Sequence, residues 1–415
     1  MNPAYILGVD VAKRNVRFHL LDTRGQRRLR GTAPATAAGL AALVDQLTPM
    51  GAPATILIVL ETTGLLHVPW AEALTAHGYP VLAVNALVAH RVQPLANVLR
   101  ANKTDQIDAA GLAELGRQHA AELTRFRYQT EPARFGLQRL VTVRKQLRAQ
   151  LTNLRKAYGS LLECVFPELS RLLQAKIHGC RLRAMLAAAP TPAALSTRPV
   201  GELQRAFGAQ TDAVLAAARA SLGSAALAAA SAPALQALLT AITNLEQQLA
   251  TLEVALQAQT LQVVSAAQLQ LVRSVPGIGS KTGIQIAAYL PARFWQREYW
   301  QSQPSRRRAV AHLLAFMGAE PRVRASGQWH GQTHMSKRGC EPLRTALFQA
   351  SFCGQQRDAE LATLYAHHKT QGKPHKVCIS HLIRRQTQRL ISVLQSGQAW
   401  SPLAPQKEST HALAA

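Results

Sequence analysis

Four carboxylates in the first third of the chain have the residue type and spacing needed to bind a divalent metal. Asp105 and Asp108 lie three residues apart at the start of an expected helix, so both point to one face of it. Acids near a helix N-terminus are common for dipole reasons alone, but Asp10 and Glu61 lie within or at the end of apolar runs typical of buried strands. A carboxylate there is costly unless it is paired, and Mg²⁺ or Mn²⁺ is an efficient partner. We therefore predict that the four acids share one metal site, with Lys103 beside them contacting nucleic acid.

A serine with many cations near it in the sequence forms a second candidate centre. Ser326 precedes a glycine, a pair that usually marks only a turn. The surrounding cations could hold a phosphate and stabilise charge during phosphoryl transfer to a hydroxyl. A phosphate pocket without a covalent step is the alternative, and His330 and His334 are either activating bases or surface residues. The cations are Arg322, Arg324, Lys337, Arg338 and Arg344.

A glycine-containing turn at 275–282 resembles a helix-hairpin-helix element. Gly277 and Gly279 lie between two expected short helices, and Lys281 follows them. Glycines let the backbone approach a phosphate, and the next helix presents free N–H groups. We predict phosphate contact by these three residues, with a plain interhelical turn as the alternative. The spacing differs from that of a Walker A loop.

The elements that must position the acids indicate an α/β sheet. Strand patterns at 4–12, 16–22 and about 27–32 are followed by strands at 55–61 and 80–85 that alternate with helices. Early hairpin strands followed by alternating helices and strands are the order of an RNase H-like (RuvC-like) fold. We assign residues 1–125 to this metal-binding domain.

Two leucine seams, at 137–165 and 235–256, predict long coiled-coil helices within a second region, 126–265. The helices either fold on each other or pair between protomers as a dimerisation arm. An Ala- and Pro-rich helical insertion is expected between them, at about 171–234. A mainly helical domain over 266–400 and a flexible tail over 401–415 complete the chain.

The charge of the chain favours nucleic acid as its partner. The formal net charge is +25, and it divides into +3 for residues 1–120 and +11 for each of 121–300 and 301–415. The five cysteines form no CxxC pair, so neither a disulfide framework nor a zinc ribbon is indicated, and a cytoplasmic location fits. The start of the chain reads as a strand instead of a signal peptide, and no apolar run approaches the roughly 20 residues of a membrane span.

Several motifs resemble those of the DEDD-type insertion-sequence transposases, a family that includes the Piv-type DNA invertases and bridge-RNA-guided recombinases. The segments that resemble the DEDD motif are Asp10-Val11-Ala12-Lys13, Glu61-Thr62-Thr63-Gly64 and 103–109. Those that resemble the second domain of the family are 276–279, 318–321, Ser326-Gly327, 336–339 and Leu343-Arg344. The motifs occur in the family's order along the chain.

The resemblance implies a RuvC-like domain, a coiled-coil arm and a transposase domain whose nucleophile is Ser326. It implies that the four acids bind Mg²⁺ and that Ser326 forms a covalent 5′-phosphoserine link to DNA. It also implies a homodimer or homotetramer in which acids of one protomer face the serine of another. The implied partners are donor and target DNA and a bridge RNA that pairs with both.

Other functions stay open at this point. A Mg²⁺-dependent, structure-specific nuclease of the junction-resolving type would use the same acids with water as the nucleophile. An RNA-independent DNA invertase would read DNA directly. A non-catalytic nucleic-acid-binding protein is weakened by the presence of all four acids and the serine. An actin-like ATPase, suggested by residues 8–13, would need a second phosphate loop that the sequence lacks.

Overall fold

The computed structural model describes residues 3–62, 64–91, 105–129, 131–173, 179–322, 325–326, 329–330 and 334–402. Two of the predicted site residues, Lys103 and Arg324, lie outside these ranges, as do 403–415 in the predicted tail. The side chains of Asp105 and Ser326 are likewise outside the description, although their backbone positions are within it. The chain forms two compact units, Met1–Glu131 and Pro132–Ala415. The predicted three-part division stays a prediction, because its second and third parts share one unit.

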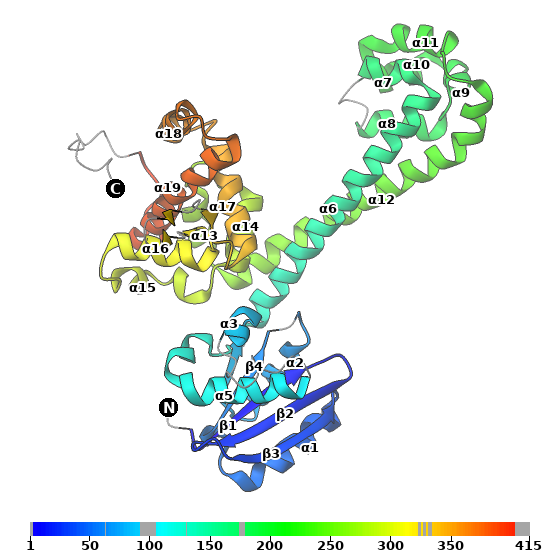
Figure 1. Ribbon diagram of the computed structural model, residues 1–415. Helices are drawn as coiled ribbons and strands as arrows, with labels where there is room; N and C mark the ends of the chain where they lie inside the picture. Colours follow the sequence, from blue (N-terminus) through cyan, green and yellow to red (C-terminus); the bar gives the residue numbers. More distant parts are fainter. Residues whose placement is uncertain are drawn as a thin grey trace. The chain divides into compact units, whose positions relative to one another are not determined.

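The first unit is built on a five-stranded sheet with the order β3-β2-β1-β4-β5 (Figure 1). The strands β1, β2 and β3 form an antiparallel meander, and β4 and β5 run parallel to β1. This mixed α/β arrangement is compatible with the expected RNase H-like fold. The strands are β1 Tyr5–Val11, β2 Asn15–Asp22, β3 Arg27–Pro34, β4 Ile56–Glu61 and β5 Val81–Val84. The α-helices are α1 Ala37–Leu47, α2 His67–Ala76, α3 Ala86–Arg91 and α5 Asp105–Leu123.

Each face of this sheet has its own apolar core, because successive side chains of a strand point to opposite faces. Leu7 and Val9 of β1 pack in one core with residues of α1 and α2. Ile6 of β1 packs in the other core with Leu112 and Leu115 of α5. The helix α5 therefore covers one face of the sheet, and α1 and α2 cover the other.

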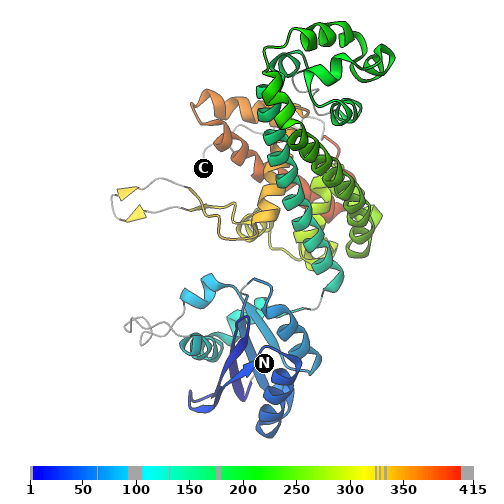
Figure 2. The ribbon, with the colours of Figure 1, turned by 90° about the vertical axis from the view of Figure 1, so that its right-hand side faces the viewer.

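The second unit contains a long pair of helices, α6 Pro132–Val165 and α12 Ala225–Val263, that lie side by side (Figures 1 and 2). Buried residues recur every seven positions along both helices. They are Leu137, Arg144, Leu151, Tyr158 and Val165 on α6, and Leu235, Ile242, Leu249 and Leu256 on α12. The two predicted seams thus face each other within one chain, and dimerisation through this arm stays a prediction.

Glutamates of α12 neutralise part of the basic charge of the arm. Glu253 lies 3.4 Å from Arg144 and 3.1 Å from Arg148. Glu246 accepts hydrogen bonds from Arg155 at 2.6 Å and from Arg183 at 2.9 Å. These arginines therefore link helices of the second unit through ion pairs. The pairing lowers the net positive charge that the arm presents to a polyanion.

Five short α-helices among the described residues close the far end of the arm around a separate apolar core that includes Phe166 and Leu203. They are α7 Pro167–Leu173, α8 Cys180–Ala188, α9 Pro192–Ser196, α10 Val200–Phe207 and α11 Thr211–Arg219. The insertion is expected to end at about 234, but in the structure α12 begins before that and contains Pro233. Ser224 caps α12 by accepting a hydrogen bond from the Leu227 N–H, so the helix begins at Ala225 and includes the proline.

By length and composition alone, α12 is apolar enough to cross a membrane, a criterion that core helices also meet. The seam at 235–256 predicts this helix, but an apolar stretch long enough for a membrane span was not expected there, because alanines supply many of its apolar residues. In the structure, α12 packs along α6.

The remaining helices of the second unit, apart from α18, pack around Phe294, Trp300, Leu313, Leu347 and Leu390, and α18 packs through Leu361 against α19. The base of the arm joins this core, because Leu137 of α6 and Leu256 of α12 belong to it. Arg134 of α6 also donates a hydrogen bond to the Ala287 carbonyl at 2.6 Å. The helices are α13 Ala266–Arg273, α14 Ser280–Tyr289, α15 Arg297–Gln301, α16 Arg306–Met317, α17 Glu341–Gly354, α18 Ala359–Thr370 and α19 His375–Ser396.

Candidate active site and nucleic-acid interface

Asp10 and Glu61 lie at equivalent positions on neighbouring parallel strands. The β1–β4 register ends with Val9 opposite Leu60, so Asp10 and Glu61 are the next residues on their strands. Both are half-buried, and both lie on the face that α5 covers. Across the antiparallel β1–β2 pair, Asp10 lies opposite Arg17, which places a cation on the same face.

The helix α5 crosses β1 at Gly8 with almost no space between the two backbones. A Cβ atom on Gly8 would lie 2.0 Å from the Ala109 carbonyl oxygen and 2.4 Å from the Ala113 nitrogen. Further along the helix, Gly116 lies against Ile6 and Val59. Earlier residues of α5 thus lie over later residues of β1, so the helix runs antiparallel to the strand.

This crossing directs the N-terminal end of α5 toward Asp10. From Gly8 to Asp10 the strand advances about 6.6 Å, and from Ala109 back to Asp105 the helix advances about 6 Å. Asp108 is half-buried beside Ala109, and Asp105 begins the helix. The backbone therefore brings the predicted acids from three separate segments to one edge of the sheet.

The donor set suits a hard divalent cation, because Mg²⁺ and Mn²⁺ prefer carboxylate oxygens. Among the residues whose side chains are described, no three His, Cys, Asp or Glu side chains form a ready ligand group. The fourth predicted ligand, Asp105, is not among them. The carboxylate oxygens of these residues, and the position of the residues at one edge of the sheet, fit a divalent metal ion.

Ser326 lies in the outer of two short antiparallel strand pairs that form a narrow ribbon. The outer rungs are β7 Ala325–Ser326 and β8 Trp329–His330, with Ser326 opposite Trp329. The inner rungs are β6 Pro321–Arg322 and β9 His334–Met335. In Figure 2 the outer strands, drawn in yellow, stand away from the helices of the second unit.

The base of this ribbon is fixed tightly to α16 and α17. Gly318 ends α16 with φ of +66°, and its carbonyl accepts a hydrogen bond from the Lys337 N–H at 2.9 Å. A Cβ on Gly339 would lie 2.4 Å from the Phe316 carbonyl oxygen, so only glycine fits there. The Cys340 N–H donates to that same carbonyl at 2.8 Å, and burial raises the pKa of the Cys340 thiol to about 11.

The predicted cations occupy the base of the ribbon instead of the serine end. Arg322 precedes Ser326 by four residues, lies in the other pair of strands, opposite His334, and is exposed. Lys337 and Arg338 are exposed beyond β9. Arg344 donates a hydrogen bond from Nη1 to the Met317 carbonyl at 2.7 Å, so it helps to cap α16. The described backbone thus separates Ser326 from Arg322, Lys337 and Arg338.

The two glycines of the helix-hairpin-helix-like turn have different roles. Gly277 has φ of +88°, and a Cβ there would lie 2.0 Å from the Ala350 carbonyl oxygen of α17. Gly277 therefore lets the turn pack against a neighbouring helix instead of a phosphate. Gly279 and Lys281 are exposed, and a Cβ on Gly279 would meet open space. The end of the turn that could contact phosphate is the Gly279–Lys281 end.

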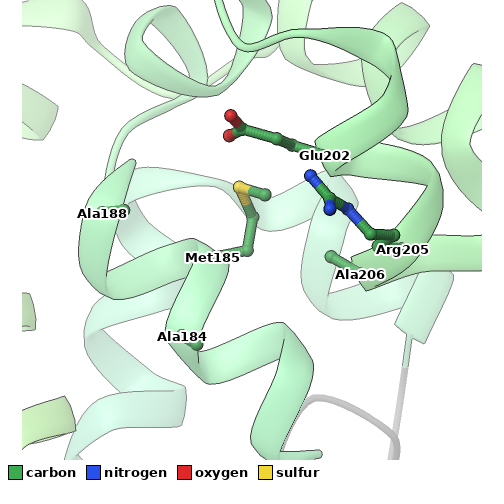
Figure 3. Close-up of a pocket in the computed structure, with 6 residues that line it drawn as sticks. All are labelled: Ala184, Met185, Ala188, Glu202, Arg205 and Ala206. Atoms are coloured by element: carbon green, nitrogen blue, oxygen red, sulfur yellow. The ribbon is translucent and has the colours of Figure 1, made fainter.

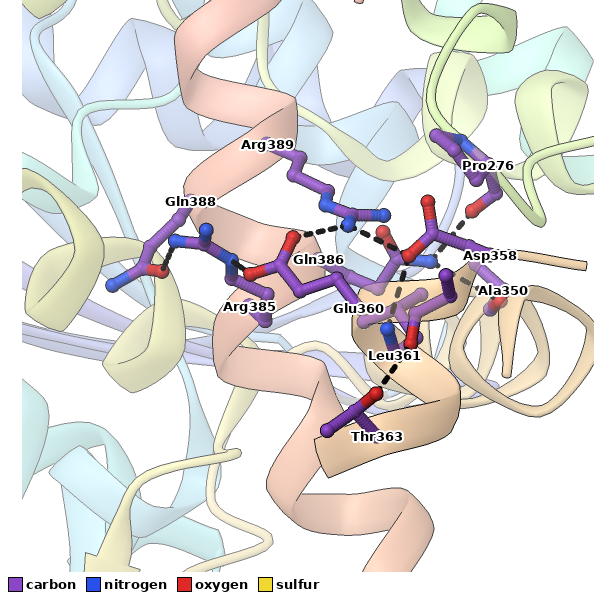
Figure 4. A network of polar contacts seen from close by, with 11 residues as sticks. Pro276, Ala350, Asp358, Glu360, Leu361, Thr363, Arg385, Gln386, Gln388 and Arg389 are labelled. Atoms are coloured by element: carbon purple, nitrogen blue, oxygen red, sulfur yellow. Dashed lines mark hydrogen bonds and ion pairs between the residues drawn. The ribbon is translucent and has the colours of Figure 1, made fainter. Parts of the chain in front are cut away.

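A buried polar network holds this turn in place (Figure 4). The Gln386 side-chain amide donates to the Pro276 carbonyl at 2.7 Å and to the Ala350 carbonyl at 3.2 Å. One turn further along α19, the buried Arg389 reaches Asp358 at 2.8 Å and Glu360 at 2.5 Å. The sequence analysis overlooked Gln386 and Arg389, although polar residues inside the apolar repeat of a helix are a signal for such a network.

Lys281 lies at the basic end of a cleft of about 460 Å³ formed by α6, α14 and α17. The other cations that line it are Arg144, Lys145 and Arg148. Burial and the charge of Arg148 lower the pKa of Arg144, and Glu253 opposes this shift. The cleft combines one predicted contact residue with three cations that the sequence analysis placed on the arm.

A separate pocket of about 620 Å³ lies between α8 and α10, far along the arm from these residues (Figure 3). Met185 and four alanine or arginine neighbours line it, and Glu202 stands at its edge. Its lining contains no residue of either predicted centre, so we do not assign it to the reaction.

The comparisons with known proteins match both parts of the chain. Residues 7–167 match the profile described as transposase of the DEDD type of IS110, and residues 269–366 match that of the transposase IS116/IS110/IS902 family. The chain belongs to the IS110-type DEDD transposases. It is also 25% identical over 421 residues to the insertion element IS110 uncharacterized 43.6 kDa protein of Streptomyces coelicolor, covering 96% of each protein.

The matched segments of this transposase contain every predicted site residue. The four acids and Lys103 fall within 7–167, and the turn, the ribbon and its cations fall within 269–366. Most of α7–α12 and the chain after residue 366 lie outside both matches. The predicted family and enzyme class are thus confirmed, whereas the roles of individual residues stay predictions.

Proposed function

We propose that this transposase cleaves and exchanges DNA strands of an insertion sequence through a covalent serine intermediate, with an RNase H-like domain holding Mg²⁺ or Mn²⁺. The observation that supports this most directly is the crossing of α5 over Gly8, which directs Asp105 and Asp108 toward Asp10 and Glu61. These four acids would hold the metal. When bound, it would orient a phosphate and stabilise charge on its oxygens.

In the proposed step the Ser326 hydroxyl attacks the phosphorus of a DNA phosphodiester. The bond from phosphorus to the 3′ oxygen breaks, and that oxygen leaves as a 3′-hydroxyl with the proton that the serine gives up. A 5′-phosphoserine remains, and a 3′-hydroxyl of another strand later attacks it and releases the serine. No ATP is consumed, because the phosphoserine ester conserves the energy of the phosphodiester bond.

We also propose that a bridge RNA encoded by the element pairs with donor and target DNA and supplies sequence specificity. The charge of +25 supports binding to nucleic acid backbones, with Gly279, Lys281, Arg322, Lys337 and Arg338 as candidate contacts. The protein would act as a homodimer or homotetramer in the cytoplasm. Expressing it with the DNA that flanks its gene, purifying it and sequencing the retained RNA tests the guide. Recovery of no discrete flanking RNA would favour an RNA-independent invertase.

Covalent trapping tests the serine mechanism. End-labelled DNA carrying the element's junction is incubated with protein and Mg²⁺, and the products are denatured and separated. We expect a protein–DNA adduct from the wild type and none from Ser326→Ala, whereas Ser302→Ala, an exposed serine of the same unit, keeps the adduct. Cleavage by Ser326→Ala at the wild-type rate would instead support the nuclease with water as its nucleophile.

The acids are tested with isosteric amides. Asp10→Asn and Glu61→Gln should each lower the rate of adduct formation at least about 100-fold, since the site loses a charged ligand. Asp45→Asn, an exposed acid of α1, is the matched control and should act like the wild type. Full activity of both site variants would disprove the metal role.

A further inference from the structure

The corner between α18 and α19 concentrates histidines and lysines that have no role in the proposed reaction. No acidic residue occurs from 361 to 407 in the sequence. The nearest acids, Asp358 and Glu360, are already paired with Arg389 and Arg385. We call this surface the histidine corner. It consists of His367, His368, Lys369, Lys373, His375, Lys376 and His381.

Two imidazoles of this corner, those of His368 and His381, pack against each other. His368 and His381 stack with their centroids 4.1 Å apart. The Lys373 ammonium lies 3.2 Å from His368 Nδ1, and the Gln371 side-chain oxygen lies 3.4 Å from the same nitrogen. Burial lowers the pKa of both His368 and His381, and the charge of Lys373 lowers both further, while the contact with Gln371 opposes part of the shift at His368. Near neutral pH the lysines therefore carry the charge, and the stacked rings add polarisable surface.

An exposed aromatic side chain extends this surface onto α17. Phe352 is 41% exposed, and its ring centroid lies 5.9 Å from that of His375. The Tyr365 hydroxyl lies 2.7 Å from His375 Nδ1, which fixes the imidazole beside the phenyl ring. Aromatic rings next to lysines are the combination by which proteins hold unpaired nucleotides, because bases stack on the rings and phosphates meet the cations.

From these contacts we infer that the histidine corner and Phe352 bind an unpaired segment of nucleic acid, either RNA or DNA. Lys369, Lys373 and Lys376 meet the phosphates, and Phe352 with the histidine rings stacks against bases. The inference rests on the proposed function in that it presupposes handling of nucleic acid strands. The corner lies almost entirely beyond residue 366, where the second family match ends.

The charge part is tested by anisotropy of labelled 20-nucleotide strands bound to the full-length protein. The variant Lys369→Gln/Lys373→Gln/Lys376→Gln should bind at least about tenfold more weakly. Its slope of log affinity against log salt should be shallower by about 2, since each phosphate contact on a single strand contributes about 0.7. The matched control removes three exposed arginines of the helices beyond the arm, Arg171→Gln/Arg205→Gln/Arg219→Gln, at the same net charge.

The stacking part is tested with Phe352→Leu, which we expect to lose about tenfold in affinity for the strand. A duplex of the same sequence should be bound equally by Phe352→Leu and the wild type. Parallel DNA and RNA strands show which nucleic acid the corner prefers. Equal losses for strand and duplex would overturn the assignment to unpaired nucleotides.

A pH series gives a readout that a purely structural role would not change. A bound phosphate favours the charged imidazole, so wild-type affinity should rise about tenfold as pH falls from 7.5 to 5.5. The groups that face the stacked pair are Lys373, His367 and Gln371. In His368→Asn/His381→Asn this rise should largely disappear, with a melting temperature near that of the wild type.

The inference fails if the triple lysine variant behaves like the triple arginine control. This result is separable from the proposed function, because strand binding needs no catalysis. Strand binding that depends on the corner in a protein that forms no DNA adduct would disprove only the reaction.

Discussion

At the scale of single residues, Gly8 shows how a residue without a side chain can set the geometry of a site. The absence of a Cβ atom allows α5 to touch β1 through backbone atoms at Ala109 and Ala113. The position of Asp108 relative to Asp10 follows directly from that contact. Gly8 lies two residues before Asp10, and only the acid of this pair was predicted to take part in the metal site.

We predict that Gly8→Ala separates the helix from the strand. A methyl group 2.0 Å from the Ala109 oxygen cannot be accommodated, so stability should fall by about 1–3 kcal/mol and the Mg²⁺ requirement for activity should rise. Thermal denaturation and a Mg²⁺ titration of adduct formation measure both effects. Gly159→Ala, inside α6 with nothing within 4 Å, is the control and should be neutral or stabilising.

Also at the scale of single residues, the Arg389–Asp358 ion pair shows how a largely buried carboxylate is kept ionised. Burial opposes ionisation of Asp358, but hydrogen bonds from Arg389 and from the Leu361 N–H outweigh it and hold the pKa of the carboxyl below its ordinary value. A carboxylate with a depressed pKa stabilises the folded state above its unfolded pKa of about 4, and this contribution is lost as pH falls further.

We therefore expect acid to destabilise the second unit through this pair. Asp358→Asn keeps the cap of α18 but removes the charge, so stability at pH 7 should fall by about 3 kcal/mol. The variant should also lose less stability than the wild type between pH 5 and pH 3. Urea titrations at several pH values measure both. Asp212→Asn, an exposed acid of α11, should keep the wild-type pH dependence, and an unchanged slope in Asp358→Asn would contradict the assignment.

At the scale of elements, the glycine turn and the serine ribbon are both fixed at one end and open at the other. Gly277 and Gln386 fix the turn to α17 and α19, which leaves Gly279 and Lys281 exposed. Gly318 and Gly339 fix the base of the ribbon, and Ser326 lies in its outer pair of strands. Both elements thus present their candidate reactive end on a rigid support.

We predict that Gln386→Met loosens the turn. Two buried carbonyls, those of Pro276 and Ala350, would lose their donor, at a cost of about 1–3 kcal/mol. Nucleic acid affinity should fall together with the melting temperature, because the Gly279–Lys281 end loses its support. Gln388→Met, on a different side of α19, is the control. Affinity that stays at the wild-type value in a destabilised Gln386→Met protein would separate the turn from binding.

At the scale of the whole molecule, most of the net positive charge lies outside the segment that carries the four acids. Residues 1–120, which carry the acids, hold a net +3, and each of the two later segments holds +11. Part of the later charge is used internally, as the pairs at Glu246 and Glu253 show. Part of the exposed remainder lies on the ribbon base, the turn, the first turn of α16 and the histidine corner.

Such a distribution predicts binding that is governed by salt. If six to ten cations contact phosphates of a duplex, affinity should fall about 10³–10⁵-fold between 50 and 200 mM salt. Anisotropy titrations across that range measure the slope. A slope near zero would contradict the assignment of these surfaces to nucleic acid.

The sequence predicted the sheet, the helix pair and the acids because each depends on local pattern. Apolar runs define strands and seven-residue repeats define the seam, so Asp10, Glu61 and the arm could be located. Contacts between distant segments leave no such pattern. The separation of Ser326 from Arg322 and Lys337, the inward role of Gly277 and the network of Gln386 depend on how remote helices pack. The start of α12, capped by Ser224, could not be predicted, because Pro233 follows it and proline is usually excluded from the interior of a helix.

The length of the α6–α12 helix pair also limits how far the arm can reach, as a rod of fixed length would. The 34 residues of α6 form one unbroken helix, about 51 Å long at 1.5 Å per residue. The small helices described at its far end pack back along it, since Arg183 of α8 pairs with Glu246 of α12, so the length of α6 sets the outer reach of the arm. On a duplex that rises 3.4 Å per base pair, this corresponds to about 15 base pairs. Lengthening or shortening both helices by matched heptads would therefore move any contact made by the tip in steps of about three base pairs.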